Sequence, residues 1–253
     1  MKNDDAYRAR IEREAAFHDH SYSTDLRPDA VGKFYTIAES SYEDYRRRVF
    51  ENVDGRRVLE YGCGINSHGT DLVRAGADVV GIDISPVAIE ESQRVAEEQG
   101  LGDRIAYHVM NAEELTFEAD SFDLVCGIGI LHHLDTELAA AEIARVLRPG
   151  ARGIFHEPLG HNPVFNRFRD RTPELRTPDE HPLLKEDFRM MRRHFSTVDV
   201  TPYNLGTLAA VPLRSTPLFG PLHTLLRGLD RAMMTVIPPM KWWAWQTVVE
   251  IQK

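Results

Sequence analysis

The stretch VLEYGCGINSHG, residues 58–69, constrains the fold of this chain most strongly. An apolar run ends at the acid Glu60, and two glycines one residue apart, Gly62 and Gly64, follow it. This order is typical of a strand that turns sharply into a helix, where backbone N–H groups carry partial positive charge and point toward a ligand. The stretch therefore predicts an α/β fold with a site for a nucleotide-like ligand.

Short β-rich runs alternate with helical patterns from residue 56 onward, which is typical of a parallel sheet with helices on both faces. The predicted strands are 57–61, 78–82, 105–110, 122–127 and 153–156, then STVDVTPYN at 196–204 and a last strand formed by WWAWQTVVEIQK at 242–253. One predicted helix begins after the N-cap Ser85, with Pro86 at its first position. Another begins after Asp135 and is expected to end at Pro149–Gly150.

Residues 1–54 are expected to form an N-terminal helical unit, with helices over 6–17 and 42–53 and with Tyr22 and Tyr35 between them. This unit is either a packing arm or a cover over the ligand mouth. Residues 55–253 form the main domain. Two Pro-rich insertions, at about 158–182 and 205–240, are expected to form a lid near the carboxyl edge of the sheet. The Leu and Met residues of the second insertion either close a small core, line an apolar acceptor pocket or form a surface that meets lipid.

Composition excludes several classes of protein. The 253 residues carry a net charge of -9, which disfavours nucleic acid as a partner because binding to a polyanion needs clustered Lys and Arg. Cys63 and Cys126 lie in apolar stretches and support neither a disulfide framework nor a zinc cluster. The first twenty residues are too charged for a signal peptide, and no apolar run is long enough to span a bilayer. A cytoplasmic location is expected.

The glycine turn admits two kinds of nucleotide ligand. A dinucleotide fingerprint, G-x-G-x-x-G, requires a glycine at position 67, which is Ser67 here. Asp83 ends the second predicted strand and is placed to accept hydrogen bonds from ribose hydroxyls, which both ligand classes contain. Glu60 suits a cationic group better than a diphosphate, and Asn111, after the third predicted strand, offers an amide to an adenine edge.

The series VLEYGCG, VVGIDIS, NAEEL, FDLVCGIGILHHL and VLRPGARGIFHEP resembles, in order and spacing, the motifs of class I S-adenosylmethionine-dependent methyltransferases. The resemblance covers residues 57–158. It implies a Rossmann-like fold with a doubly wound, mostly parallel seven-stranded sheet, in which one antiparallel strand belongs to the closing hairpin. It also implies S-adenosyl-L-methionine as the cofactor and a small, fairly apolar acceptor, with oxygen favoured as the acceptor atom over nitrogen and carbon.

The resemblance implies a role for each matching residue. The loop around the methionine part would contain Glu60, Gly62 and Gly64; Asp83 would bind the ribose; Ile84, Asn111 and Ala112 would meet the adenine; and Gly127 and Ile128 would line the sulfonium side. The sequence departs from the family at Asn66, where many members keep a third glycine. We expect this bulkier loop to shift the affinity for the cofactor without abolishing binding.

Methyl transfer from a sulfonium is an in-line displacement that requires alignment and exclusion of water, and a base only where the acceptor arrives protonated. His133, in LHHLD just past the fourth predicted strand, is one candidate base, and a structural role in that loop is its alternative. Glu157 is the second candidate. It follows His156 at the end of the fifth predicted strand, where only one of two neighbours faces the site.

No metal is expected, because His18 and His20, which flank Asp19, diverge on a helix. Two other functions stay open at this point. One is an NAD(P)-dependent oxidoreductase on the same kind of sheet, and the other is a protein that binds S-adenosylmethionine without catalysis. The oligomeric state is not determined by these patterns.

Overall fold

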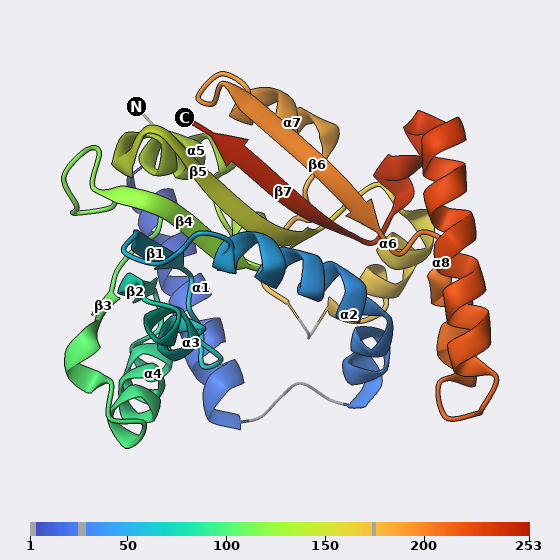
Figure 1. Cartoon of the computed structure of the whole chain (residues 1–253), viewed down its shortest axis with the longest axis horizontal. Coiled ribbons are helices and arrows are strands. Elements are labelled where there is room, and N and C mark those ends of the chain that lie inside the picture. Colours follow the sequence, from blue (N-terminus) through green and yellow to red (C-terminus); the bar gives the residue numbers. More distant parts are fainter. Residues whose placement is uncertain (1–3, 25–28, 174–175) are drawn as a thin grey trace.

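The computed structural model of the chain describes residues 4–24, 29–173 and 176–253; the side chains of residues 4, 24 and 29–36, Tyr35 among them, lie outside the description. A seven-stranded sheet with the order β3-β2-β1-β4-β5-β7-β6 runs through the molecule (Figure 1). Its strands are β1 (Arg57–Tyr61), β2 (Asp78–Asp83), β3 (Ile105–Val109), β4 (Phe122–Ile128), β5 (Leu147–Pro158), β6 (Thr197–Tyr203) and β7 (Gln246–Gln252). Only β7 is antiparallel to its neighbours, so the predicted doubly wound sheet with one antiparallel strand is confirmed.

The strand order reverses beside β1, which lies between β2 and β4. In such sheets, ligands bind outside the carboxyl ends of the strands at this switch point. The chain leaves β1 through Gly62 and Gly64, whose φ angles of 71° and 55° are accessible to glycine at little cost. A Cβ on Gly62 would also lie 2.7 Å from Cγ1 of Ile130. These two glycines therefore allow the chain to turn and to pass close to the loop after β4.

The helices that flank the sheet are α3 (Gly69–Arg74), α4 (Pro86–Glu98), α5 (Thr136–Val146) and α7 (Lys185–Met191), with short 3-10 helices η1 (Gly102–Arg104) and η2 (Leu131–His133). Two of them, α4 and α5, begin where the capping pattern predicts. The side chain of Ser85 accepts a hydrogen bond from the Ala88 N–H, and that of Asp135 accepts from Glu137 and Leu138. These caps satisfy backbone donors that a helix start leaves unpaired.

Two predicted boundaries are wrong. The helix α5 ends at Val146, because Leu147 already pairs with Phe122 in the sheet, and Pro149–Gly150 belong to β5. The pairing register shifts between Phe122 and Leu124, and such an irregularity tolerates a proline. The second wrong boundary is the start of the last strand. Trp242 and Trp243 belong to the 3-10 helix η5 (Pro238–Trp243), so this strand begins only at Gln246.

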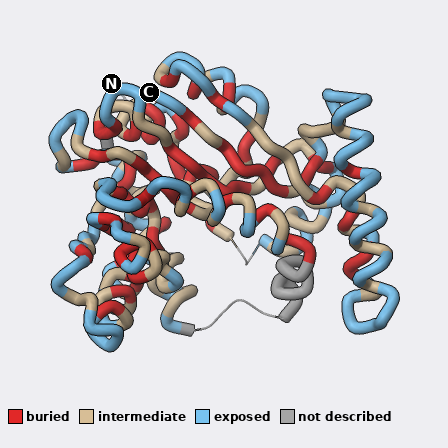
Figure 2. The backbone as a smooth tube through the Cα atoms, in the orientation of Figure 1, coloured by how far each residue is buried: buried red, intermediate tan, exposed pale blue. Residues whose placement is uncertain are grey.

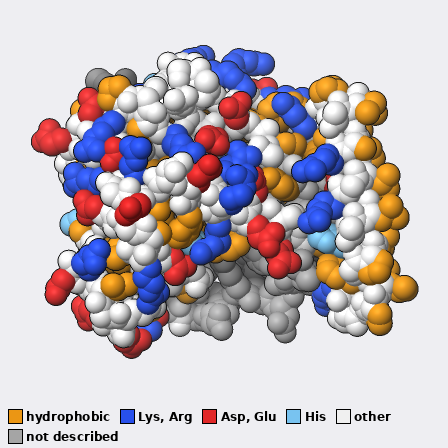
Figure 3. Space-filling view, in the orientation of Figure 1, with side chains coloured by type: hydrophobic (Ala, Val, Ile, Leu, Met, Phe, Trp, Pro, Cys, Tyr) orange, Lys and Arg blue, Asp and Glu red, His pale blue; other side chains and the backbone are white. Residues whose placement is uncertain are grey.

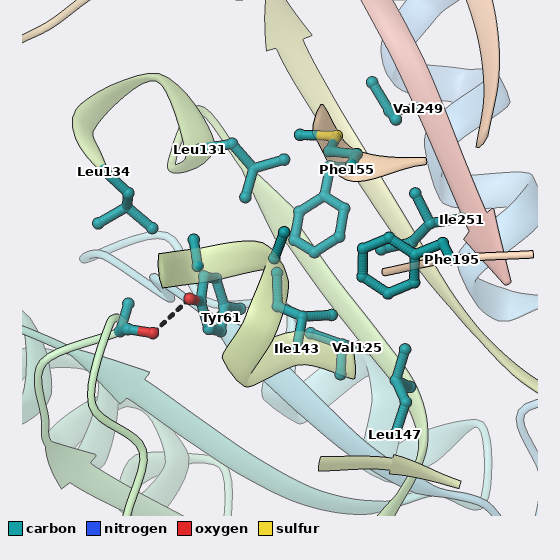
Figure 4. Packing of buried hydrophobic residues seen from close by; sticks show 14 of the residues in the cluster. Tyr61, Val125, Leu131, Leu134, Ile143, Leu147, Phe155, Phe195, Val249 and Ile251 are labelled. Carbon is teal, nitrogen blue, oxygen red and sulfur yellow. Dashed lines mark hydrogen bonds between the residues drawn. The ribbon is translucent and has the colours of Figure 1, made fainter. Parts of the chain in front are cut away.

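Apolar side chains fill both sides of the sheet, and the buried backbone runs along its strands (Figure 2). On one side Tyr61, Ile143, Leu147 and Phe155 pack together (Figure 4). The hydroxyl of Tyr61 donates to the carbonyl of Ala112, so this buried phenol has a partner. Burial of each large apolar side chain contributes about 1.5–3 kcal/mol, which holds the strand ends of the switch point rigidly in place.

The segment predicted to be an N-terminal helical unit contains α1 (Asp4–Thr24) and α2 (Asp29–Phe50), both longer than predicted. The insertions contain α6 (Pro163–Asp170), the 3-10 helix η4 (Thr207–Leu213) and α8 (Phe219–Val236). Figure 1 shows α8 at the edge of the molecule opposite β3. Among the described residues, no helix combines the length and the apolar character needed to cross a membrane.

Candidate functional site

A cavity of about 970 Å³ lies at the carboxyl ends of β1, β2 and β4. The structure brings ten of the eleven predicted site residues to its wall: Glu60, Gly62, Gly64, Asp83, Ile84, Asn111, Ala112, Gly127, Ile128 and His133. The remaining predicted residue, Glu157, does not line it. The volume is at the upper end of the range, roughly 300–1,000 Å³, that small-molecule sites occupy.

The loop INSH is built around the buried carboxylate of Glu60. Its Oε2 accepts a hydrogen bond of 2.5 Å from the Ser67 hydroxyl, and its Oε1 accepts one of 2.6 Å from the His68 N–H. The Ser67 oxygen lies 2.9 Å from the Tyr107 hydroxyl and accepts from the Gly69 N–H. A glycine at position 67 would remove this hydroxyl, so Ser67 belongs to the support of Glu60 rather than to a diphosphate cradle.

Asp83 braces the glycine turn. Its Oδ2 accepts a hydrogen bond of 2.9 Å from the Gly64 N–H, and its Oδ1 accepts one of 2.9 Å from the Ser85 N–H. Burial raises the pKa of Asp83, although these two hydrogen bonds oppose the rise. A Cβ on Gly64 would lie 3.2 Å from the Tyr22 hydroxyl, so α1 passes directly over this turn.

Hydrogen bonds also join α1 to the segment that follows β3. The amide of Asn111 donates to the Tyr7 hydroxyl at 2.9 Å, and its oxygen accepts from the Glu113 N–H at 3.0 Å. The buried carboxylate of Glu113 accepts from Arg10 at 2.5 Å and from the Asp135 N–H at 2.6 Å. The predicted adenine segment and the N-terminal helix are therefore held together by direct contacts.

Glu14, on the cavity-facing side of α1, approaches two histidines. Its Oε2 lies 3.2 Å from Nδ1 of His133 and 3.7 Å from Nε2 of His18, and its Oε1 accepts from the Thr177 hydroxyl. Burial acts to raise the pKa of Glu14, but hydrogen bonds from His133, His18 and Thr177 outweigh it and hold that pKa well below its usual range. The Glu14 side chain is therefore an orienting carboxylate that stays ionised.

Two sets of three side chains, which share His133, offer ligand-type atoms within 4.8 Å of one another: Glu14, His18 and His133, and His132, His133 and Glu180. In each set two residues come from one segment, and the third comes from a distant part of the chain. Chain neighbours alone, such as Asp19 and His20 beside His18, do not indicate these sets.

Glu157 faces away from the cavity, so the prediction that it points into the site is wrong. Its Oε1 accepts hydrogen bonds from the Ile130 and Leu131 N–H groups, and its Oε2 lies 2.7 Å from Nδ1 of His132. Burial raises the pKa of Glu157 to about 7 against the pull of those hydrogen bonds. These contacts hold the turn η2 in place. Both carboxylate oxygens of Glu157 are engaged by protein groups and do not face an acceptor.

His156 is the neighbour that lines the cavity instead. Its Nε2 lies 2.9 Å from the Ser41 hydroxyl of α2, and burial lowers its pKa to about 4. Neighbouring side chains of the strand face opposite sides, as expected, but His156 faces the cavity and Glu157 faces away from it.

Sequence reasoning missed the contribution of α1. Arg10, Glu14, His18 and Tyr22 all line the cavity, and they follow one another at intervals of four residues. Residues spaced in this way share one face of a helix. The spacing of these polar side chains is the sequence pattern that could have predicted a helix face directed toward a ligand.

Residues 59–155, which run from β1 through most of β5, match the family model described as a methyltransferase domain. These residues form a methyltransferase domain, the kind of domain that the motif resemblance implied.

Curated relatives of the methyltransferase domain include methyltransferase GfsG of Streptomyces halstedii, 34% identical over 121 residues, which are 46% of this chain and 43% of that protein. Sterol 24-C-methyltransferase erg6 of Aspergillus fumigatus is 32% identical over 128 residues, 50% of this chain and 33% of the relative. The matches thus span less than half the length of these relatives.

A solved structure of similar fold is phosphoethanolamine N-methyltransferase 2 of Haemonchus contortus in complex with S-adenosyl-L-methionine. It has a TM-score of 0.65 and 18% identity, and the match covers 94% of this chain and 60% of that one. At this identity the likeness concerns the fold. It extends the similarity beyond the methyltransferase domain to nearly the whole chain.

Proposed function

We propose that this protein transfers a methyl group from S-adenosylmethionine to an oxygen of a small, fairly apolar acceptor, with His133 as the general base. The observation that carries the proposal is that one cavity contains both the residues assigned to the cofactor and the pair of His133 and Glu14. A base next to the cofactor site is what a hydroxyl acceptor requires, because its proton must leave as the methyl group arrives.

The residues of the turn fit the cofactor. Gly62 and Gly64 have positive φ angles, and a Cβ would collide with Ile130 at Gly62 and crowd the Tyr22 hydroxyl at Gly64, so the backbone itself faces this part of the cavity. Asp83 and Glu60 are carboxylates suited to ribose hydroxyls and to an ammonium group. When bound, S-adenosylmethionine supplies an electrophilic methyl group on a sulfonium.

In the proposed reaction, Nδ1 of His133 holds a proton that it donates to Glu14, which leaves Nε2 as the basic nitrogen. The acceptor hydroxyl gives its proton to Nε2 while its oxygen forms the new bond to the methyl carbon, and the carbon–sulfur bond breaks with its electron pair on sulfur. Glu14 stabilises the imidazolium that results. The neighbouring His132, whose pKa burial holds well below its usual value, stays neutral.

Apolar side chains around the base support a fairly apolar acceptor. Ile11, Leu134, Pro158 and Trp245 line the same cavity. The name of the relative from Aspergillus fumigatus gives a sterol as its acceptor, which agrees with this lining. We further propose that the N-terminal unit, residues 1–54, is the cover of the cavity, since both α1 and α2 contribute to its wall.

We propose that the proton transfer proceeds without a metal ion. Each oxygen of Glu14 already faces a donor, Thr177 on one side and His133 on the other. Full activity after dialysis against a chelator, with metal content checked by elemental analysis, is the expected result. Activity that returns only on addition of zinc or magnesium would overturn this part of the proposal.

Titration calorimetry with S-adenosylmethionine, S-adenosylhomocysteine and NAD tests the cofactor. We expect the first two to bind, and binding of NAD alone would favour the oxidoreductase. Mass spectrometry of reactions with phenols, amines and lipid alcohols then tests catalysis. Tight cofactor binding with no methylated product from any of these classes would favour the non-catalytic alternative.

A further inference from the structure

The helix α8 presents an apolar stripe to solvent. Leu225, Leu229, Met233 and Val236 are 60%, 47%, 38% and 78% exposed, and their spacing of four, four and three residues places them on one face. Among the described residues, seven of the ten large hydrophobic side chains that are exposed lie between positions 218 and 243. Figure 3 shows hydrophobic side chains along the outer edge of this helix. Clustering of this kind marks an interaction surface, whereas singly scattered residues do not.

The opposite side of α8 is fixed to the protein. The buried carboxylate of Asp230 accepts hydrogen bonds from the N–H groups of Leu205, Gly206 and Thr207, at 3.0, 2.7 and 3.2 Å. Met234 packs against the main core. The inward residues therefore account for the packing of this insertion. The outward stripe is a separate feature with a fixed orientation.

The charge of this region is opposite to that of the whole chain. Residues 214–243 contain four cationic side chains, Arg214, Arg227, Arg231 and Lys241, and a single acid, the buried Asp230. The chain as a whole carries -9. In Figure 3, Lys and Arg side chains lie beside the hydrophobic edge of α8. An apolar stripe flanked by cations complements the surface of an anionic bilayer, where each cation adds attraction to the headgroups.

We propose that α8 and η5 bind the surface of an anionic lipid bilayer, with the stripe of Leu225, Leu229, Met233 and Val236 inserted at the level of the headgroups. The helix has 18 residues and three charged side chains, and it lies on the membrane without crossing it. Trp243, half-exposed at the end of η5, has the ring type that favours this interface. Trp245 and Gln246 of the cavity wall follow within three residues, so the docked surface adjoins the proposed acceptor site.

The test is cosedimentation of the full chain with vesicles of phosphatidylcholine and phosphatidylglycerol in equal amounts. We expect binding that weakens when phosphatidylglycerol is omitted and when salt is raised from 0.1 to 1 M, which shortens the Debye length from about 10 to about 3 Å. The variant L225S/L229S/M233S should lower the partition coefficient at least tenfold. The matched control is Val109→Ser, which changes an exposed valine on β3, at the far edge of the sheet.

Calorimetry with S-adenosylmethionine and circular dichroism check that the triple variant remains folded, and they make the result independent of the proposed reaction. Absence of vesicle binding by the wild-type chain, or equal binding by the triple variant, would overturn the proposal. So would a wild-type dimer that the triple variant converts to monomer without any vesicle binding, because the stripe would then contact a second copy of the chain.

Discussion

Nδ1 of His133 lies 3.2 Å from Oε2 of Glu14, although the two residues are 119 positions apart in the chain. The contact joins the first helix to the turn that follows β4. Arg10, one turn earlier on α1, also donates to the carbonyl oxygen of His133 at 3.3 Å. The orientation of the proposed base therefore depends on a helix that lies outside the matched methyltransferase domain.

Replacement of Glu14 by Gln should lower kcat by about ten- to a hundredfold, because the neutral amide neither orients His133 nor stabilises its charged form. His133→Gln should lower kcat further, within the range of about 10²–10⁴ that general-base catalysis supplies. Both variants should keep the dissociation constant of S-adenosylmethionine within about threefold, since neither changes the glycine turn. Steady-state kinetics and calorimetry separate the two quantities.

Glu12→Gln serves as the control, because Glu12 is exposed on the same helix. A wild-type kcat in Glu14→Gln would remove the carboxylate from the mechanism. A kcat of His133→Gln equal to that of the wild-type chain would show that methylation of the acceptor needs no base.

The residues that we assign to the cofactor could be recognised in the sequence because they lie at or immediately after the ends of strands. Gly62, Asp83 and Asn111 each follow or end a run whose apolar pattern marks a strand, and parallel strands bring their carboxyl ends to one edge. The proposed acceptor half depends on contacts between distant segments, such as Glu14 with Thr177. No local pattern encodes such a pair, and at the end of β5 the assignment of facing residues to His156 or Glu157 required the register of the whole strand.

Asp83→Ala should weaken the binding of S-adenosylmethionine at least tenfold, which corresponds to about 1.4 kcal/mol. The loss includes the proposed ribose contact and the bracing of the Gly64 N–H. Asp78→Ala, at the exposed start of the same strand, is the matched control and should bind normally. Calorimetry at constant pH provides both affinities, and an unchanged constant in Asp83→Ala would place the ribose elsewhere.

Ser67→Gly completes the G-x-G-x-x-G pattern of a dinucleotide site. It also removes the hydroxyl that donates a hydrogen bond to Glu60. We expect the free energy of unfolding to fall by about 1–3 kcal/mol, the cost of an unsatisfied buried group, and we expect no binding of NAD. Chemical denaturation measures the first quantity and calorimetry the second. The variant would contradict our account of the INSH loop if it bound NAD and unfolded at the wild-type denaturant concentration.

The pH dependence of stability should report the burial of His156. Its pKa of about 4 in the folded protein lies below the ordinary 6.5, so its neutral form stabilises the fold above pH 6.5, and this contribution is lost as the pH falls toward 4. Between pH 7.5 and 4.5 the wild-type chain should lose roughly 2–3 kcal/mol more unfolding free energy than His156→Gln. Glu157, whose pKa of about 7 lies above its ordinary value, acts in the opposite direction, but it is present in both proteins and does not affect their difference.

Urea unfolding at the two pH values measures the effect, and His108→Gln, at an exposed position on β3, is the control. Equal losses in the wild-type chain and in His156→Gln would mean that His156 takes up its proton in the folded state as readily as in the unfolded chain.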